Sequence, residues 1–293
     1  MNFINDEYNE IIGDLLGDAL YAMNSNRGKI MSIRSYTEVV VRKIIDYNPD
    51  KKIMLGDICK KGSDAYEYAS KKLSDVNLKR LRHLVTLLTE NGNKAVHTKE
   101  RSPFSDEQLN KTIDVLYELL SFLFIDYFQK NIIDSTISPQ ILEDFSLLPP
   151  EIRYKSLIYV YENNYRNVYI ADKLCLASLK YLGKKDTLKW LEKEKYILQK
   201  QEYPDDSFKE ELRKKGPLTA ELVISMLPKN AYELCLEKIG PVSAQIEDNG
   251  LLYKEFEEAK AFYLNNKKQH PMTSELISLH DLMDFVYIGR KVI

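Results

Sequence analysis

Apolar residues recur every three or four positions along most of the chain, which is the spacing of one face of an α-helix. Between Ile30 and Ile44, for example, they form one continuous stripe. The expected helices cover residues 6–23, 29–47, 53–59, 64–73, 77–89, 105–129, 151–163, 168–182, 185–199, 207–214, 218–227, 230–238, 251–265 and 273–289. Turn-forming pairs such as Gly216-Pro217 and Gly240-Pro241 separate many of them. This pattern predicts an all-α fold.

A polar stretch from Asn131 to Gln140 interrupts the helical series. The residues before it supply enough apolar helix faces for a bundle with its own core. Ser105 is placed to begin the last helix of that bundle, with Gln108 completing a capping box. Beyond the polar stretch, Pro149-Pro150 starts a second series of helices. We therefore expect a helical domain over residues 1–130 and a mainly helical domain of unknown role over residues 140–293.

The composition agrees with a helical globular protein. Of the 293 residues, 44% are hydrophobic and 29% are charged, while only 11 are glycine and 10 are proline. The 42 Lys and Arg residues against 44 Asp and Glu residues give a net charge of −2, which excludes a generally basic nucleic-acid coat. The three scattered cysteines form no CxxC pair and no disulfide framework, so we expect a reducing, cytoplasmic location.

We expect neither a membrane segment nor a bound cofactor. The apolar cluster from Leu116 to Phe128 is too short and too interrupted by polar residues to span a bilayer. The first residues lack the basic start and apolar core of a signal peptide. The motifs of phosphate-binding and dinucleotide-binding loops are absent, and so are HExxH and any Cys/His cluster that would hold a metal.

Charge is distributed unevenly along the chain. Residues 25–101 contain 17 Lys and Arg against 9 Asp and Glu, a net charge of +8, whereas residues 1–24 carry five acids and no base. One interpretation is a phosphate-attracting face for RNA, DNA or a nucleotide, with Arg42, Lys43, Arg82 and Lys94 among its cations. The other interpretation is an ordinary solvated helix surface, complemented by acidic helices of the same bundle.

The segment Gly92-Asn93-Lys94-Ala95-Val96-His97 is the most informative local sequence. Its Gly/Asn composition predicts a turn between two long helices. In a structural role, His97 would satisfy backbone carbonyl groups at the end of a helix. In a functional role, the imidazole would exchange protons near neutral pH.

Two short motifs in this order resemble the HEPN-like helical domains called domain of unknown function 4145. The first is Arg34-Ser35-Tyr36-Thr37-Glu38, and the second is Leu81-Arg82 followed by the segment that ends at His97. The resemblance covers about residues 1–130. It implies a place in prokaryotic restriction or antiphage systems. Catalytic HEPN domains are metal-independent RNases that usually act as dimers, so the resemblance also implies a homodimer.

The resemblance assigns roles to individual residues. Asn93 and His97 match the polar residue and the histidine of the RNase motif, but Glu90, Asn91 and Gly92 stand where its arginine is needed. The chemistry needs a cation to stabilise the charged phosphorane and a histidine to move a proton. Arg34, Arg82 or Lys94 would have to supply that cation.

Arg34 and Glu38 lie four residues apart and therefore share a helix face. They form either a structural ion pair or a polar site, in which Glu38 orients His97 or Arg34 binds phosphate. The sequence thus leaves two functions open. The first is a defence-linked accessory protein that binds nucleic acid or a nucleotide signal, with RNase activity as an extension. The second is a non-catalytic interaction or regulatory module that binds a partner protein, as an antitoxin does.

Overall fold

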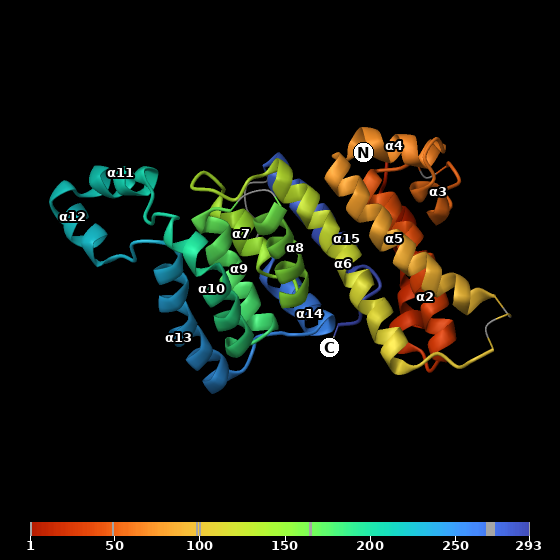
Figure 1. Cartoon of the computed structure of the whole chain (residues 1–293). Coiled ribbons are helices and arrows are strands. Elements are labelled where there is room, and N and C mark those ends of the chain that lie inside the picture. Colours follow the sequence, from red (N-terminus) through yellow and green to blue (C-terminus); the bar gives the residue numbers. More distant parts are fainter. Residues whose placement is uncertain are drawn as a thin grey trace. The chain divides into compact units, whose positions relative to one another are not determined.

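The computed structural model describes residues 2–48, 50–97, 99, 101–163, 166–267 and 273–292, with only the backbone at Leu218. These residues form fifteen α-helices, a 3-10 helix Asn5–Tyr8 and a π-helical turn Gly17–Tyr21, and they contain no β-strand (Figure 1). One isolated antiparallel bridge pairs Glu202 with Asn230. The predicted all-α fold is confirmed.

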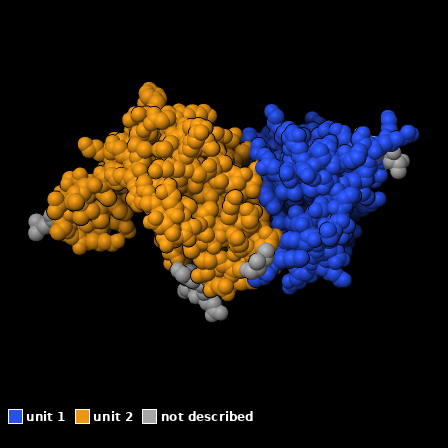
Figure 2. All heavy atoms as spheres, turned by 90° about the horizontal axis from the view of Figure 1, so that it is seen from below, with its two compact units in different colours: residues 1–126, 277–293 blue, residues 127–276 orange. Residues whose placement is uncertain are grey.

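The chain divides into two compact units, which are coloured separately in Figure 2. Unit 1 comprises residues 1–126 and 277–293, and unit 2 comprises residues 127–276. The predicted division into 1–130 and 140–293 is therefore wrong for residues 277–293. They belong to unit 1 because the ring of Phe285 packs edge to face against Phe3 at 5.5 Å, and because Asp281 pairs with Lys43 at 2.5 Å.

Unit 1 is built around two long antiparallel helices, α2 and α5, that lie side by side (Figure 1). Its helices are α1 Asn9–Leu16, α2 Asn26–Ile45, α3 Leu55–Cys59, α4 Asp64–Lys72, α5 Asp75–Val96, most of α6 Asp106–Lys130 and most of α15 Ser274–Tyr287. The apolar stripes predicted from the sequence are buried, with Ile33 and Val40 on α2 and Leu81 and Leu88 on α5 at 1% exposure or less.

The capping box predicted at the start of α6 is present. The Ser105 hydroxyl accepts a hydrogen bond from the Gln108 backbone N–H at 3.2 Å, and the Gln108 side chain accepts one from the Ser105 N–H at 2.9 Å. Together they satisfy two backbone donors that the first helical turn leaves free.

The turn predicted from Gly92 to His97 is wrong, because α5 continues through it to Val96. Gly92 and Ala95 are both buried in unit 1, and this packing outweighs the cost of glycine in a helix, which is about 1 kcal/mol. A second predicted break, at Gly240-Pro241, also lies inside a helix, α13 Ala231–Asn249. Burial of Ile239 on the turn before the proline favours continuation of that helix.

Unit 2 is organised around α9 Val168–Tyr181, which packs against α8, α10 and α13. Its other helices are α7 Pro139–Phe145, α8 Pro150–Asn163, α10 Lys184–Gln199, α11 Asp206–Lys215, α12 Pro217–Met226, α13 Ala231–Asn249 and α14 Phe256–Asn266. Nine of the fourteen residues of α9 are buried, which is expected of a helix covered on several sides.

Candidate functional site at the C-terminal end of α5

The candidate histidine stands at the C-terminal end of α5. Its backbone N–H donates a hydrogen bond to the carbonyl oxygen of Asn93 at 3.0 Å, so His97 is the C-terminal cap residue of the helix. The His97 side chain is exposed, as is that of Lys94 one turn earlier. An exposed imidazole is free to meet a ligand from solution, which a histidine buried against the helix ends is not.

Arg34 of α2 reaches the same turn of α5. Its Nε donates a hydrogen bond to Oδ1 of Asn93 at 3.1 Å. Asn93 therefore connects two of the predicted site residues, since its side chain accepts from Arg34 and its backbone carbonyl accepts from His97. The sequence motifs that carry the HEPN resemblance thus meet in space, although 59 residues separate Arg34 from Asn93.

The close approach of α2 to α5 at this point depends on Gly92. A Cβ atom at position 92 would lie 2.3 Å from Cδ and 2.6 Å from Cβ of Arg34. Real Cβ atoms do not approach other carbons so closely, so the stem of Arg34 occupies the space that a side chain at position 92 would need. Gly92 therefore has a packing role that the sequence interpretation as a turn residue missed.

Arg27, which no sequence motif singled out, brings a second arginine to the end of α5. Its Nη1 donates a hydrogen bond to the carbonyl oxygen of Ala95 at 2.9 Å, and its guanidinium lies 5.0 Å from the centre of the Phe104 ring. A cation at this place offsets the negative end of the helix dipole. The available signal was the spacing of seven residues between Arg27 and Arg34, which places both on one face of α2.

Glu38 does not join the group at the end of α5. Its carboxylate forms an ion pair with Arg42 at 3.5 Å, one turn further along α2. The predicted pairing of Glu38 with Arg34, and its predicted role in orienting His97, are therefore wrong. A glutamate four residues before a basic residue is the favoured order for a helical pair, and Arg34 itself is drawn toward Asn93.

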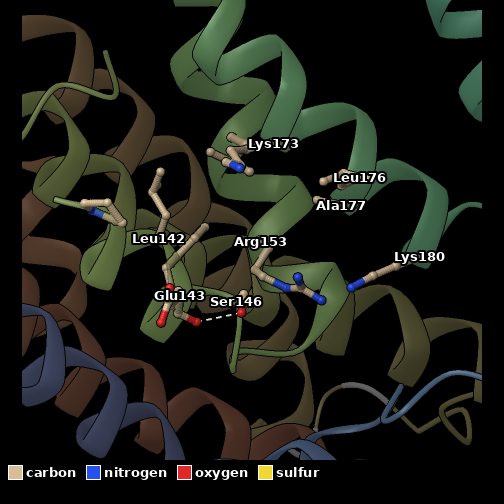
Figure 3. Close-up of a pocket in the computed structure, with 11 residues that line it drawn as sticks. Leu142, Glu143, Ser146, Arg153, Lys173, Leu176, Ala177 and Lys180 are labelled. Atoms are coloured by element: carbon tan, nitrogen blue, oxygen red, sulfur yellow. Dashed lines mark hydrogen bonds between the residues drawn. The ribbon is translucent and has the colours of Figure 1, made fainter. Parts of the chain in front are cut away.

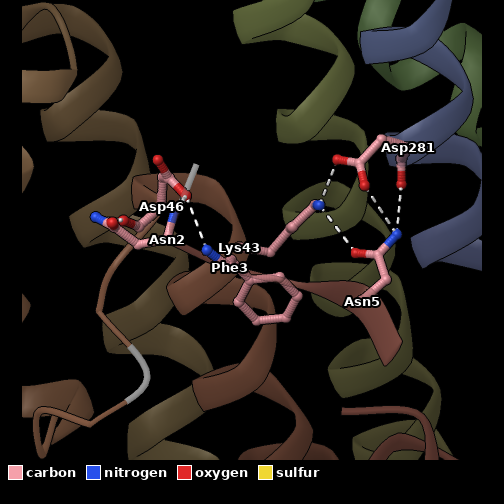
Figure 4. A network of polar contacts seen from close by, with 6 residues as sticks. All are labelled: Asn2, Phe3, Asn5, Lys43, Asp46 and Asp281. Atoms are coloured by element: carbon pink, nitrogen blue, oxygen red, sulfur yellow. Dashed lines mark hydrogen bonds and ion pairs between the residues drawn. The ribbon is translucent and has the colours of Figure 1, made fainter. Parts of the chain in front are cut away.

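Two of the predicted nucleic-acid-binding residues are instead used inside unit 1. Arg42 also donates a hydrogen bond to the backbone carbonyl of Lys51 at 2.9 Å. The Lys43 side chain is only 4% exposed, and its ammonium contacts Asn5 at 2.9 Å and Asp281 at 2.5 Å (Figure 4). These contacts join the start of the chain, α2 and α15 within the same unit.

Arg82 is likewise directed into the fold. Its Nη2 donates a hydrogen bond to the carbonyl oxygen of Cys59 at 3.1 Å, and its guanidinium lies 5.4 Å from the ring centre of Tyr66. It therefore attaches α5 to the end of α3 and to α4, away from the turn that bears His97. Lys94 alone of the four predicted nucleic-acid-binding residues is exposed at that turn.

The positive charge of residues 25–101 is partly neutralised in the folded unit. Lys72 pairs with Asp46 at 3.3 Å, and Arg80 pairs with Glu118 at 2.5 Å. At the end of α5, in contrast, the side chains of Lys94, Lys99 and Arg101 are all exposed. Lys51, Lys52, Lys60 and Lys61 are exposed as well, so the cations near His97 are one part of the exposed positive charge of unit 1.

Two further properties bear on the site. No group of three or more His, Cys, Asp or Glu residues in the described ranges is arranged to hold a metal ion. Among the helices that the structure describes, none combines the length and the apolar character needed to cross a membrane.

No protein-family model, curated protein sequence or solved structure matches this chain. The resemblance to HEPN-like domains consequently stays a prediction from the motifs at Arg34–Glu38 and Leu81–His97.

Proposed function

We propose that unit 1 binds single-stranded RNA, or a nucleotide signal, at the C-terminal end of α5. One observation carries the proposal: Asn93 holds Arg34 at the turn that ends in the exposed His97. The three exposed cations Lys94, Lys99 and Arg101 add the charge that attracts phosphate groups. The sequence resemblance supports a role as an accessory protein of a prokaryotic antiphage or restriction system.

Cleavage of the bound RNA is the catalytic extension of this proposal. His97 would accept the proton of a 2′-hydroxyl group as its oxygen attacks the adjacent phosphorus atom. The P–O5′ bond breaks, the 5′-oxygen leaves with a proton from solvent water, and a 2′,3′-cyclic phosphate remains. Arg34 would stabilise the negative charge that develops on the phosphate oxygens. This chemistry requires no metal ion, so cleavage should continue in the presence of EDTA.

A second function is favoured by a different observation. Arg34 and Arg27 are both engaged by α5, one through Asn93 and the other through the carbonyl of Ala95. Such contacts fix the packing of α2 on α5 without any ligand. They support a non-catalytic module whose exposed α5 end binds a partner protein or regulates it.

Salt-dependent RNA binding tests the main proposal. The full chain is titrated into a fluorescent single-stranded RNA at several salt concentrations. Replacing Lys94, Lys99 and Arg101 by alanine should flatten the slope of log K against log salt by up to about 2, because each lost phosphate contact contributes about 0.7 for a single strand. A control replaces the exposed Lys51, Lys52 and Lys185 and removes the same charge. Equal slopes in both variants would refute the proposal.

Cleavage and binding are separated by a second pair of variants. His97→Ala should abolish cleavage and leave RNA binding nearly unchanged, whereas Arg34→Ala should weaken both. If wild type binds RNA but cleaves none, the catalytic extension is refuted and the binding proposal stands, whereas absence of RNA binding would favour the partner-protein function. The homodimer that the resemblance implies is tested by light scattering on the same full-length preparations.

A further inference from the structure

Lys180, near the end of α9, lies where two adjoining cavities of unit 2 meet. Each cavity has a volume of about 360 Å³, and Ser146, Arg153 and Leu176 line both of them together with Lys180. The amine of Lys180 extends toward the guanidinium of Arg153 on α8 (Figure 3). An amine in this position can be reached by a small molecule that enters either cavity.

Lys180 differs from a neighbouring lysine in having no counter-charge. It is partly buried, and no ion pair or hydrogen bond to it occurs among the described residues. Lys173, two turns earlier on the same helix, pairs with Asp172 at 3.2 Å. Arg153 has a contact of its own with the ring of Tyr253, whose centre lies 5.8 Å from the guanidinium carbon. The amine of Lys180 is therefore the group that the fold leaves without a use.

The surroundings of Lys180 favour the neutral amine over the ammonium ion. Burial, and then the charge of Arg153, lower the pKa of this ammonium group. A lysine that is withdrawn from water, or that lies beside another cation, holds more of its unprotonated form at neutral pH. Only the unprotonated form has the lone pair that attacks a carbonyl carbon, so Lys180 is suited to act as a nucleophile.

The two cavities differ in their acidic residues. Glu143 lines the first cavity, whereas no described Asp or Glu lines the second, which we call the Lys180 cavity. The Lys180 cavity is lined by Ser146, Arg153, Leu176, Lys180, Val242, Gln245, Ile246, Asn249, Gly250, Leu251, Leu252, Tyr253 and Phe262. Most of this lining is apolar or aromatic. It offers the amine no carboxylate that would keep it protonated, and it offers a ligand a surface for an apolar body.

We propose that Lys180 binds a small aldehyde or ketone as a Schiff base, with the apolar or aromatic body of the ligand against Val242, Ile246 and Phe262. The Nζ lone pair attacks the carbonyl carbon and forms the C–N bond. The carbonyl oxygen then leaves as water with the two hydrogens of the amine, and a C=N bond remains. No group is oxidised or reduced in this step. The cavity volume of about 360 Å³ falls at the small end of the range for ligand pockets, which fits a small molecule.

Reductive trapping on the wild-type full chain tests the proposal. The chain is incubated at neutral pH with limiting benzaldehyde and cyanoborohydride, which reduces an imine to a stable amine, and mass spectrometry locates the modified lysines. Benzaldehyde should modify Lys180 faster than Lys185, an exposed lysine of α10. Acetaldehyde undergoes the same reaction but has no ring to bury. Its ratio of Lys180 to Lys185 modification should be smaller by about tenfold or more, the effect of burying an aromatic ring.

A pair of variants tests the place of the ligand. Ile246→Trp fills the apolar part of the Lys180 cavity and should slow the modification of Lys180 by benzaldehyde about tenfold. The matched variant Leu222→Trp adds the same ring at an exposed position on α12 and should change that rate less than about twofold.

Three results would each overturn the proposal: equal modification of Lys180 and Lys185 by benzaldehyde, the same Lys180-to-Lys185 ratio with both aldehydes, or an unchanged rate in a folded Ile246→Trp chain. The first two are read on the wild-type chain and depend on no substitution. Because Lys180 lies in unit 2, failure of this proposal would leave the RNA-binding proposal for α5 unaffected.

Discussion

The side chain of Arg34 lies directly over the backbone of Gly92, in the space that any larger residue at position 92 would need. We expect Gly92→Ala to lower the free energy of unfolding by up to about 2 kcal/mol. Overpacking costs about 1–3 kcal/mol, and the better helix propensity of alanine offsets about 1 kcal/mol of it. Urea denaturation followed by far-ultraviolet circular dichroism measures the change.

The control repeats the Gly92→Ala substitution in a chain that lacks the Arg34 side chain. In an Arg34→Gly background the obstructing Cβ, Cγ and Cδ atoms are all gone, so Gly92→Ala should become neutral or slightly stabilising. Equal destabilisation in both backgrounds would show that the two residues do not interact in solution.

The buried ammonium of Lys43 joins α2 to Asp281 of α15. Lys43→Ala should lower the free energy of unfolding by about 3 kcal/mol, because it removes one partner of a mostly buried pair and leaves Asp281 without its cation. Lys72→Ala serves as the control, since Lys72 is 44% exposed and its pair with Asp46 is worth less than about 1 kcal/mol. Similar losses in the two variants would contradict the structural role given to Lys43.

Asp46 should make the stability of unit 1 depend on pH. Partial burial would raise the pKa of its carboxyl group, but hydrogen bonds from the backbone N–H groups of Phe3 and Asn2, together with Lys72, lower it overall (Figure 4). A folded-state pKa below the unfolded value stabilises the fold above the unfolded pKa, and this contribution is lost as pH falls through the folded pKa.

The comparison of wild type with Asp46→Asn isolates this effect. Asparagine tolerates the left-handed backbone conformation of position 46, where φ is 53°, so the substitution mainly removes the charge. Wild type should be the more stable protein at about pH 6, and its advantage should shrink toward about pH 3. A difference that stays constant over this range would argue against a lowered pKa.

The sequence predicted the helices well because their signal is local. Apolar spacing located α2 and α5, and Ser105 with Gln108 identified the start of α6 at the same two residues that make the capping contacts. The breaks at Gly92 and at Gly240-Pro241 were predicted wrongly. Glycine and proline favour a helix end at these positions, but burial against neighbouring helices favours continuation, and both helices continue.

The contacts that define the candidate sites could not be predicted in the same way. Asp281 lies 238 residues from Lys43, and nothing periodic in the sequence connects them. Helical spacing could place Arg27 and Arg34 on one face, but it could not show that this face meets the end of α5.

The division of unit 1 into two stretches of sequence has a consequence for how the protein is made. A ribosome releases residues 127–276, and with them the whole of unit 2, before it releases the end of α15. Until then Lys43 lacks Asp281, and Phe3 lacks Phe285. The first helices to leave the ribosome are therefore among the last to complete their core. Their uncovered apolar surface is open to non-native contacts while unit 2 is synthesised.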